Sequence, residues 1–145
     1  MSVKYSLEGS ILYPGSNDFM SWLSPALLVT FGHMNTYSSP YQIVMTTFPD
    51  MDSAQQLAER LITQHLAACV NILPAMTSIY SWQDKLEHGQ EHQLLIKTEQ
   101  NRTNEVQNEI KQIHPYELPE IIVVPILDGH KPYLNWISES VHKND

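Results

Sequence analysis

Residues 114–126 read HPYELPEIIVVPI and connect a polar segment, predicted to be helical, to a short apolar strand. Pro115 and Pro119 fix their own φ angles and disfavour a helical conformation in the residues before them, so the connection is stiff. The β-branched run from Ile121 to Val124 favours a strand, and Pro125 indicates an edge strand or a bulge at its end. One short segment between core and surface therefore holds an imidazole, a phenol and two carboxylates.

The segments on either side predict further strands and helices. Alternating or β-branched runs indicate strands, and apolar residues at three- and four-residue steps indicate helices. The strands are expected at residues 41–48, 67–82 with a bend at Pro74, 91–98 and 121–124, and the helices at 52–66, 101–113 and 132–141. Asp52 or Ser53 is the expected cap of the first helix, and the polar residues from Gln83 to Gln90 are expected to form a hairpin loop.

This order, β-α-β-β-α-β with a final helix, predicts an α+β domain with a ferredoxin-like antiparallel sheet and two helices on one face. The other face needs a cover, and the chain has no further layer of helices to supply it. Tyr80, Trp82, Tyr133 and Trp136 add a large aromatic surface. We therefore expect the chain to associate with copies of itself.

Composition excludes several classes of protein. The chain has 145 residues, 42% hydrophobic and 17% charged, which is typical of one globular domain. A net charge of −8 and an isoelectric point near 5.2 argue against binding to nucleic acid or to an anionic membrane. The single cysteine, Cys69, excludes an intrachain disulfide framework and fits a reducing compartment. No apolar run is long enough to span a bilayer.

Residues 1–40 differ from the rest of the chain. They are rich in glycine, proline and serine and show no sustained periodicity. The apolar cluster from Phe19 to Phe31 could belong to a signal peptide, but its late position and the acidic Glu8 and Asp18 disfavour that interpretation. We expect residues 1–40 to be an N-terminal extension and residues 41–143 to form the folded domain.

Several ordered motifs between Ile43 and Val141 resemble the CutA family of divalent-cation tolerance proteins. These motifs are residues 67–72, 78–82, 95–98, 114–121 and 133–136. The resemblance implies a tight cytoplasmic homotrimer of ferredoxin-like subunits that is linked to copper tolerance and binds copper or another divalent metal. It implies no established catalytic reaction, and the chain is expected not to be an enzyme.

The resemblance also implies a set of copper ligands, namely a cysteine on the first strand and two histidines before the Pro-Tyr pair. The matching positions in this chain are Thr46, Ile113 and His114. Of these, His114 alone offers a ligand that copper prefers, because such sites need thiolate or imidazole. A second departure is Asp84, where the family usually has glycine; aspartate tolerates turn conformations well.

Each candidate group has a structural alternative. His114 is either a metal ligand or acid/base group, or the residue that ends a helix and complements its dipole, and the second role is favoured. Cys69 is expected to be a small buried strand residue rather than a soft ligand. The cluster of Glu87, His88, Glu91 and His92 could hold a surface metal or be a solvated turn.

A second group of candidates concerns a cleft and the contacts between subunits. Lys85 and Lys97 could meet Glu117 or Glu120 across a subunit boundary, near Tyr116, either as a polar cleft for a small anion or as structural ion pairs. Tyr80, Trp82 and Trp136 are expected to pack at the trimer interface.

Two functions follow from these observations. The first is a trimeric divalent-cation binding and tolerance protein with copper as its metal and His114 as its best residue. The alternative is a trimeric small-ligand binding or signalling module in which metal binding is incidental. Enzymatic activity ranks third, because the sequence lacks a nucleophile elbow, a phosphate loop and a metal-protease motif.

Overall fold

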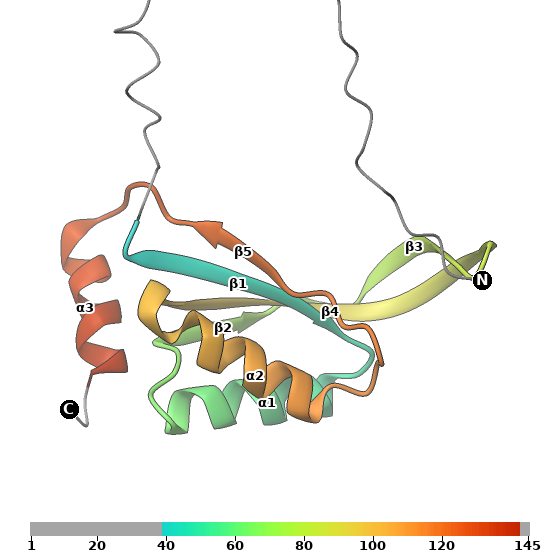
Figure 1. Ribbon diagram of the computed structural model, residues 1–145, viewed down its shortest axis with the longest axis horizontal. Coiled ribbons are helices and arrows are strands. Elements are labelled where there is room, and N and C mark those ends of the chain that lie inside the picture. Colours follow the sequence, from blue (N-terminus) through green and yellow to red (C-terminus); the bar gives the residue numbers. More distant parts are fainter. Residues whose placement is uncertain (1–38, 143–145) are drawn as a thin grey trace, which may run out of the picture. The chain divides into compact units, whose positions relative to one another are not determined.

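A computed structural model describes residues 39–142, in which strands and helices form an α+β domain (Figure 1). The elements are β1 (Tyr41–Phe48), α1 (Met51–Thr63), β2 (Cys69–Ile72), β3 (Met76–Trp82), β4 (Lys85–Glu99), the 3-10 turn η2 (Gln100–Arg102), α2 (Thr103–Ile113), β5 (Ile122–Pro125) and α3 (Lys131–Val141). The predicted extension at residues 1–40 lies outside the described residues, except for Ser39 and Pro40. Ser39 is buried, and its hydroxyl donates a hydrogen bond to the carbonyl of Ile126 at 2.5 Å.

The strands pair in the order β2-β4-β1-β5, and every neighbouring pair is antiparallel. This confirms the predicted antiparallel α+β arrangement, with α1 and α2 together on one face of the sheet (Figure 1). The strand expected at residues 67–82 is in fact two strands, β2 and β3, separated around Pro74 and paired with successive parts of β4. The β3–β4 hairpin extends beyond the helices, as Figure 1 shows.

The predicted hairpin loop from Gln83 to Gln90 is wrong. The turn consists of Gln83 and Asp84, whose φ angles are 49° and 61°, and β4 begins at Lys85. Two-residue turns with positive φ at both positions match the twist of antiparallel strands, which explains the tight connection. The outer part of β4 is polar and largely exposed, so no alternation of apolar residues marked it as a strand.

The hydrophobic core lies between the sheet and the two helices. Its fully buried side chains come from one face of β1 and β4 and from the facing sides of α1 and α2: Val44, Phe48, Leu94, Ile96, Ala54, Leu57, Leu61, Val106 and Ile110. The cap expected at Asp52 or Ser53 is instead Asp50, whose carboxylate accepts the backbone N–H of Ser53 at 2.8 Å. Ile62, on the outer side of α1, is 40% exposed.

The final helix presents two different faces. Ile137 and Val141 are fully buried, whereas Tyr133 and Trp136 are each 41% exposed. The helix is attached to β4 through Glu99, which accepts hydrogen bonds from the hydroxyl of Ser138 and from His142 Nε2, the latter at 2.7 Å. None of the helices described is long and apolar enough to cross a membrane.

Candidate functional site

His114 ends α2, and both nitrogens of its ring are engaged by the backbone. Nδ1 accepts the backbone N–H of Tyr116 at 3.0 Å, so Nε2 carries the proton of the neutral ring and donates it to the carbonyl of Thr47 at 2.6 Å. The ring also lies against Phe48 and Tyr116, with centroid distances of 4.3 and 5.1 Å. The imidazole thus joins the stiff 114–126 segment to the end of β1.

The positions that match the family's copper ligands do not fit copper. Thr46 is fully buried in the core, and its hydroxyl oxygen has no hydrogen-bond partner among the described residues. Ile113 packs against the core and offers no donor atom. The lone pair of His114 Nδ1 is already used by the N–H of Tyr116. Within residues 39–142, no group of three or more histidine, cysteine, aspartate or glutamate side chains is placed to hold a metal ion.

The acidic and histidine residues near the hairpin also do not form a cluster. They alternate along β4, so Glu87 and Glu91 point to one side and His88 and His92 to the other. Glu91 accepts a hydrogen bond from the hydroxyl of Thr47 at 3.3 Å, whereas His92 Nδ1 lies 3.0 Å from the carbonyl oxygen of Leu73.

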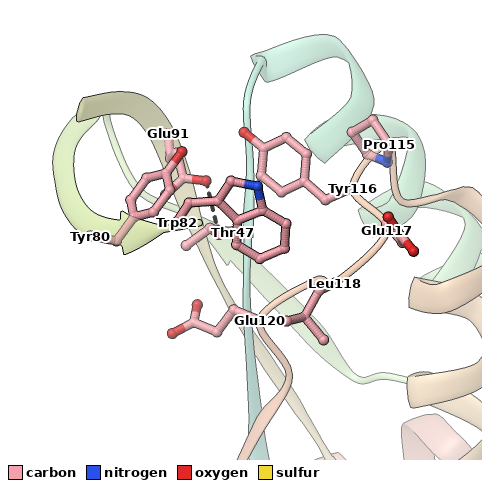
Figure 2. A pocket seen from close by; sticks show the side chains of 9 residues that line it. All are labelled: Thr47, Tyr80, Trp82, Glu91, Pro115, Tyr116, Glu117, Leu118 and Glu120. Atoms are coloured by element: carbon pink, nitrogen blue, oxygen red, sulfur yellow. Dashed lines mark hydrogen bonds between the residues drawn. The ribbon is translucent and has the colours of Figure 1, made fainter. Parts of the chain in front are cut away.

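A cavity of about 530 Å³ opens between the β3–β4 hairpin and the 114–126 segment (Figure 2). Its lining residues come from β1, β3, β4 and this segment: Thr47, Tyr80, Trp82, Glu91, Pro115, Tyr116, Glu117, Leu118 and Glu120. In the view of Figure 2, the indole of Trp82 lies at the centre, with Tyr80 and Glu91 on one side and Tyr116 on the other. The structure therefore brings together Tyr116, Glu117 and Glu120, three of the five residues predicted to form a cleft.

Thr47 and Glu91 line the cavity but were not predicted to belong to a cleft. Glu91 was considered only as part of a metal cluster, although the predicted strand at residues 91–98 includes it. The pleat of that predicted strand already puts Glu91 and Gln93 on the same side. Only the structure shows that the amide of Gln93 donates to the carboxylate of Glu120, at 3.2 Å.

The two lysines of the predicted cleft lie elsewhere. Lys85 starts β4 opposite Trp82, at the tip of the hairpin. Lys97 pairs with Cys69 across the sheet, and its ammonium contacts Cys69 Sγ at 3.4 Å and the side-chain oxygen of Asn71. In the described part of the chain, neither lysine forms an ion pair with Glu117 or Glu120 of the same protomer, and the predicted contact across a subunit boundary stays a prediction.

The electrostatics of the cavity affect Tyr116. Partial burial raises the pKa of its phenol above the usual 10.0, and the negative charge of Glu91 and a hydrogen bond to that carboxylate raise the pKa further. The phenol is consequently held protonated as a donor beside an acidic group.

The residues predicted to pack between subunits are exposed in the single chain. Tyr80 and Trp82 are each 45% exposed and line the cavity, whereas Trp136 is remote from it and lies 5.3 Å from Tyr133, measured between ring centroids. An aromatic surface therefore remains on the protomer.

Comparison with known proteins gives consistent results. The sequence model of the family described as CutA1 divalent ion tolerance protein matches residues 42–140. The divalent-cation tolerance protein CutA of Yersinia pestis (strain Pestoides F) is 46% identical over 99 residues, which are 68% of this chain and 83% of that protein.

Solved structures agree with the sequence relatives. The structure of CutA from Xylella fastidiosa matches with a TM-score of 0.69 and 41% identity, covering 71% of this chain and 99% of that chain. The structure of the periplasmic divalent cation tolerance protein CutA from Archaeoglobus fulgidus matches with a TM-score of 0.69 and 36% identity, covering 70% of this chain and 99% of that chain. The antiparallel α+β domain and the match along nearly its whole length show that the chain belongs to the CutA1 divalent ion tolerance protein family.

Proposed function

We propose that this chain is a non-catalytic homotrimer that contributes to tolerance of divalent metal ions. The observation that carries the proposal is the family match over residues 42–140, together with relatives at 46% identity that are named for divalent-cation tolerance. Because Thr46, Ile113 and His114 do not fit copper, the proposed role does not depend on a copper site at those positions.

Growth of a bacterium that lacks its own CutA gene would test this role. We expect the full chain, compared with an empty vector, to restore growth on elevated copper, zinc or another divalent cation, each tested separately. The same chain with His114→Ala should restore growth to the extent that it still folds. Failure to change growth on any divalent cation, with the protein folded and present, would overturn the proposal.

Self-association is supported by apolar surface on the protomer. The edge strand β5 exposes Ile122, Val123 and Val124 at 47%, 38% and 41%. Exposed apolar edges and patches of this kind usually mark an interface. A homotrimer would have three times the chain mass of 16.6 kDa in light scattering, and a monomeric mass would refute it.

A matched pair of variants would locate the interface. Val124→Asp places a charge on the exposed edge strand, whereas Ile62→Asp places one on α1, on the helical face, at nearly equal exposure of 41% and 40%. We expect Val124→Asp to lower the mass and Ile62→Asp to leave it unchanged. Equal masses for both variants would place the interface elsewhere.

We also propose a cytoplasmic location, supported by the single free cysteine, Cys69. The relative from Archaeoglobus fulgidus is described as periplasmic, so the location needs its own measurement. Fractionation of the native cell would place the protein in the cytoplasmic fraction if the proposal is correct.

The cavity favours a second candidate function, the binding of a small molecule. Its volume of about 530 Å³ is within the range of about 300–1,000 Å³ that is usual for small-ligand sites. In this role, the trimer would act as a ligand-binding or signalling module, and metal binding would be incidental.

A further inference from the structure

The lining of the cavity combines aromatic rings with acidic groups. Tyr80, Trp82 and Tyr116 contribute rings, and Glu91, Glu117 and Glu120 contribute carboxylates. No lysine, arginine or histidine is among the described residues that line it. Within one protomer, an anion in this cavity would meet three carboxylates without a compensating cation, so the lining of the protomer disfavours an anion as the ligand.

Glu91 is the carboxylate in this cavity that is best placed to pair with a positively charged ligand. The residue is only 7% exposed, and its carboxylate interacts with hydroxyl groups, those of Thr47 and Tyr116. Within residues 39–142, no lysine, arginine or histidine side chain lies within ion-pair distance of it. Buried carboxylates are usually paired with a cation, so this carboxylate lacks the partner that burial normally demands.

A bare metal ion is not the partner that this geometry suits. The three carboxylates do not converge into a group that could hold a metal among the described residues. Ring faces, by contrast, attract organic ammonium ions, and cavities that recognise quaternary ammonium groups are lined by aromatic side chains in this way. Figure 2 shows the rings of Tyr80, Trp82 and Tyr116 with the carboxylate of Glu91 among them.

We propose that this cavity binds a small organic cation, with its ammonium group near Glu91 and against the rings of Tyr80, Trp82 and Tyr116. The inference rests on the second function proposed above, that the cavity holds a small ligand, and assigns that ligand a positive charge. The net charge of −8 favours the approach of such a cation to the protein.

Calorimetric titration of the full-length protein in its native assembly would test the assignment. The probes are choline, its uncharged isostere 3,3-dimethylbutan-1-ol, and butyrate as a small anion. Since the isostere has the same shape without the charge, we expect choline to bind about tenfold more tightly or better, and butyrate not to bind.

Two variants and one control place the binding in this cavity. Glu91→Gln keeps the shape but removes the charge, and we expect it to weaken choline binding by about tenfold or more. Trp82→Leu, at a 45% exposed position, should weaken choline binding without preventing folding. Glu139→Gln removes the same charge from an exposed site on α3 outside the cavity and should leave the affinity unchanged.

The outcomes separate the two proposals. Equal affinity for choline and its isostere, or binding of butyrate, would leave a ligand-binding cavity but overturn the assignment of a cation. Choline binding that survives in folded Trp82→Leu and in Glu91→Gln would also overturn it, because the cation would then bind elsewhere. Absence of binding by all three probes at millimolar concentration would refute the cation assignment and remove the support for the small-ligand function as well.

Discussion

Replacement of His114 by alanine tests whether this histidine serves the structure or a metal. The change removes the hydrogen bond from Nε2 to the Thr47 carbonyl and the one from the Tyr116 N–H to Nδ1, which measure 2.6 and 3.0 Å. Each contributes about 1 kcal/mol. The lost ring contact with Phe48, at 4.3 Å between centroids, adds about 1 kcal/mol. The expected loss of unfolding free energy is therefore about 3 kcal/mol.

Guanidinium denaturation at equal protein concentration measures this loss, since the concentration must be fixed for an associating protein. The control is His88→Ala, because His88 is exposed and has no hydrogen bond or ion pair within the described residues. We expect the control to change the free energy by less than about 0.5 kcal/mol.

Copper titration of the wild type and of His114→Ala tests whether His114 is a metal ligand. Because Nδ1 of His114 is occupied by a backbone N–H, we expect copper titrations of the wild type and of folded His114→Ala to be the same. A stable His114→Ala protein that has lost stoichiometric copper binding would refute the structural interpretation and restore His114 as a ligand.

Three further predictions concern ionisation and the hairpin. Because burial and Glu91 raise the pKa of Tyr116, its contribution to stability is complete below pH 10.0 and is lost as the pH rises through the folded-state pKa. Glu91→Gln should lower the pKa of Tyr116, measured by NMR titration of the Tyr116 signal, which is identified by its absence in Tyr116→Phe. An unchanged titration midpoint in Glu91→Gln would contradict the interaction between Glu91 and Tyr116. Hydrogen bonds from the first turn of α1 lower the pKa of Asp50 below 3.8, so Asp50→Ala should reduce Tm at neutral pH, and the difference should narrow as the pH falls below 3.8; a constant difference would argue against the cap. Gln83 and Asp84 both have positive φ angles, which asparagine and glycine adopt at a lower steric cost. Replacing Gln83 by Asn together with Asp84 by Gly should therefore raise the free energy of unfolding by about 1 kcal/mol. An unchanged denaturation midpoint would disprove this.

The acidic and aromatic cavity changes how the family name applies to this protein. Relatives are named for divalent cations, yet Thr46 is a buried hydroxyl and Ile113 is apolar at two positions where the family resemblance led us to expect copper ligands. The groups that do converge, among them Trp82, Tyr116 and Glu91, suit an organic ammonium ion, which is larger than a bare metal ion. Tolerance of divalent metal ions and binding of an organic cation in the cavity are therefore separate properties, the first tested by bacterial growth and the second by calorimetric titration.

Local sequence was sufficient for the elements whose residues carry a strong local signal. The β-branched and apolar pattern of residues 41–48 specified β1, and the apolar spacing of Ala54, Leu57 and Leu61 specified α1. The proline after His114 fixed the end of α2, because the residue before a proline resists the helical conformation. These signals, in this order along the chain, were enough to predict the antiparallel α+β fold.

Tertiary structure alone decided the features that depend on pairing across long separations. The polar residues of β4 became a strand because β3 offered hydrogen bonds through the tight turn at Gln83 and Asp84. The pleat of that strand then directed Glu91 toward Tyr116, and the carbonyl of Thr47 accepts a hydrogen bond from Nε2 of His114, 67 residues away along the chain. The spacing of residues in a sequence does not specify which side chains meet across a sheet. The sequence therefore predicted a histidine and a cleft as candidates. Only the packed structure determined that the histidine links two backbone segments by hydrogen bonds and that the cleft is acidic.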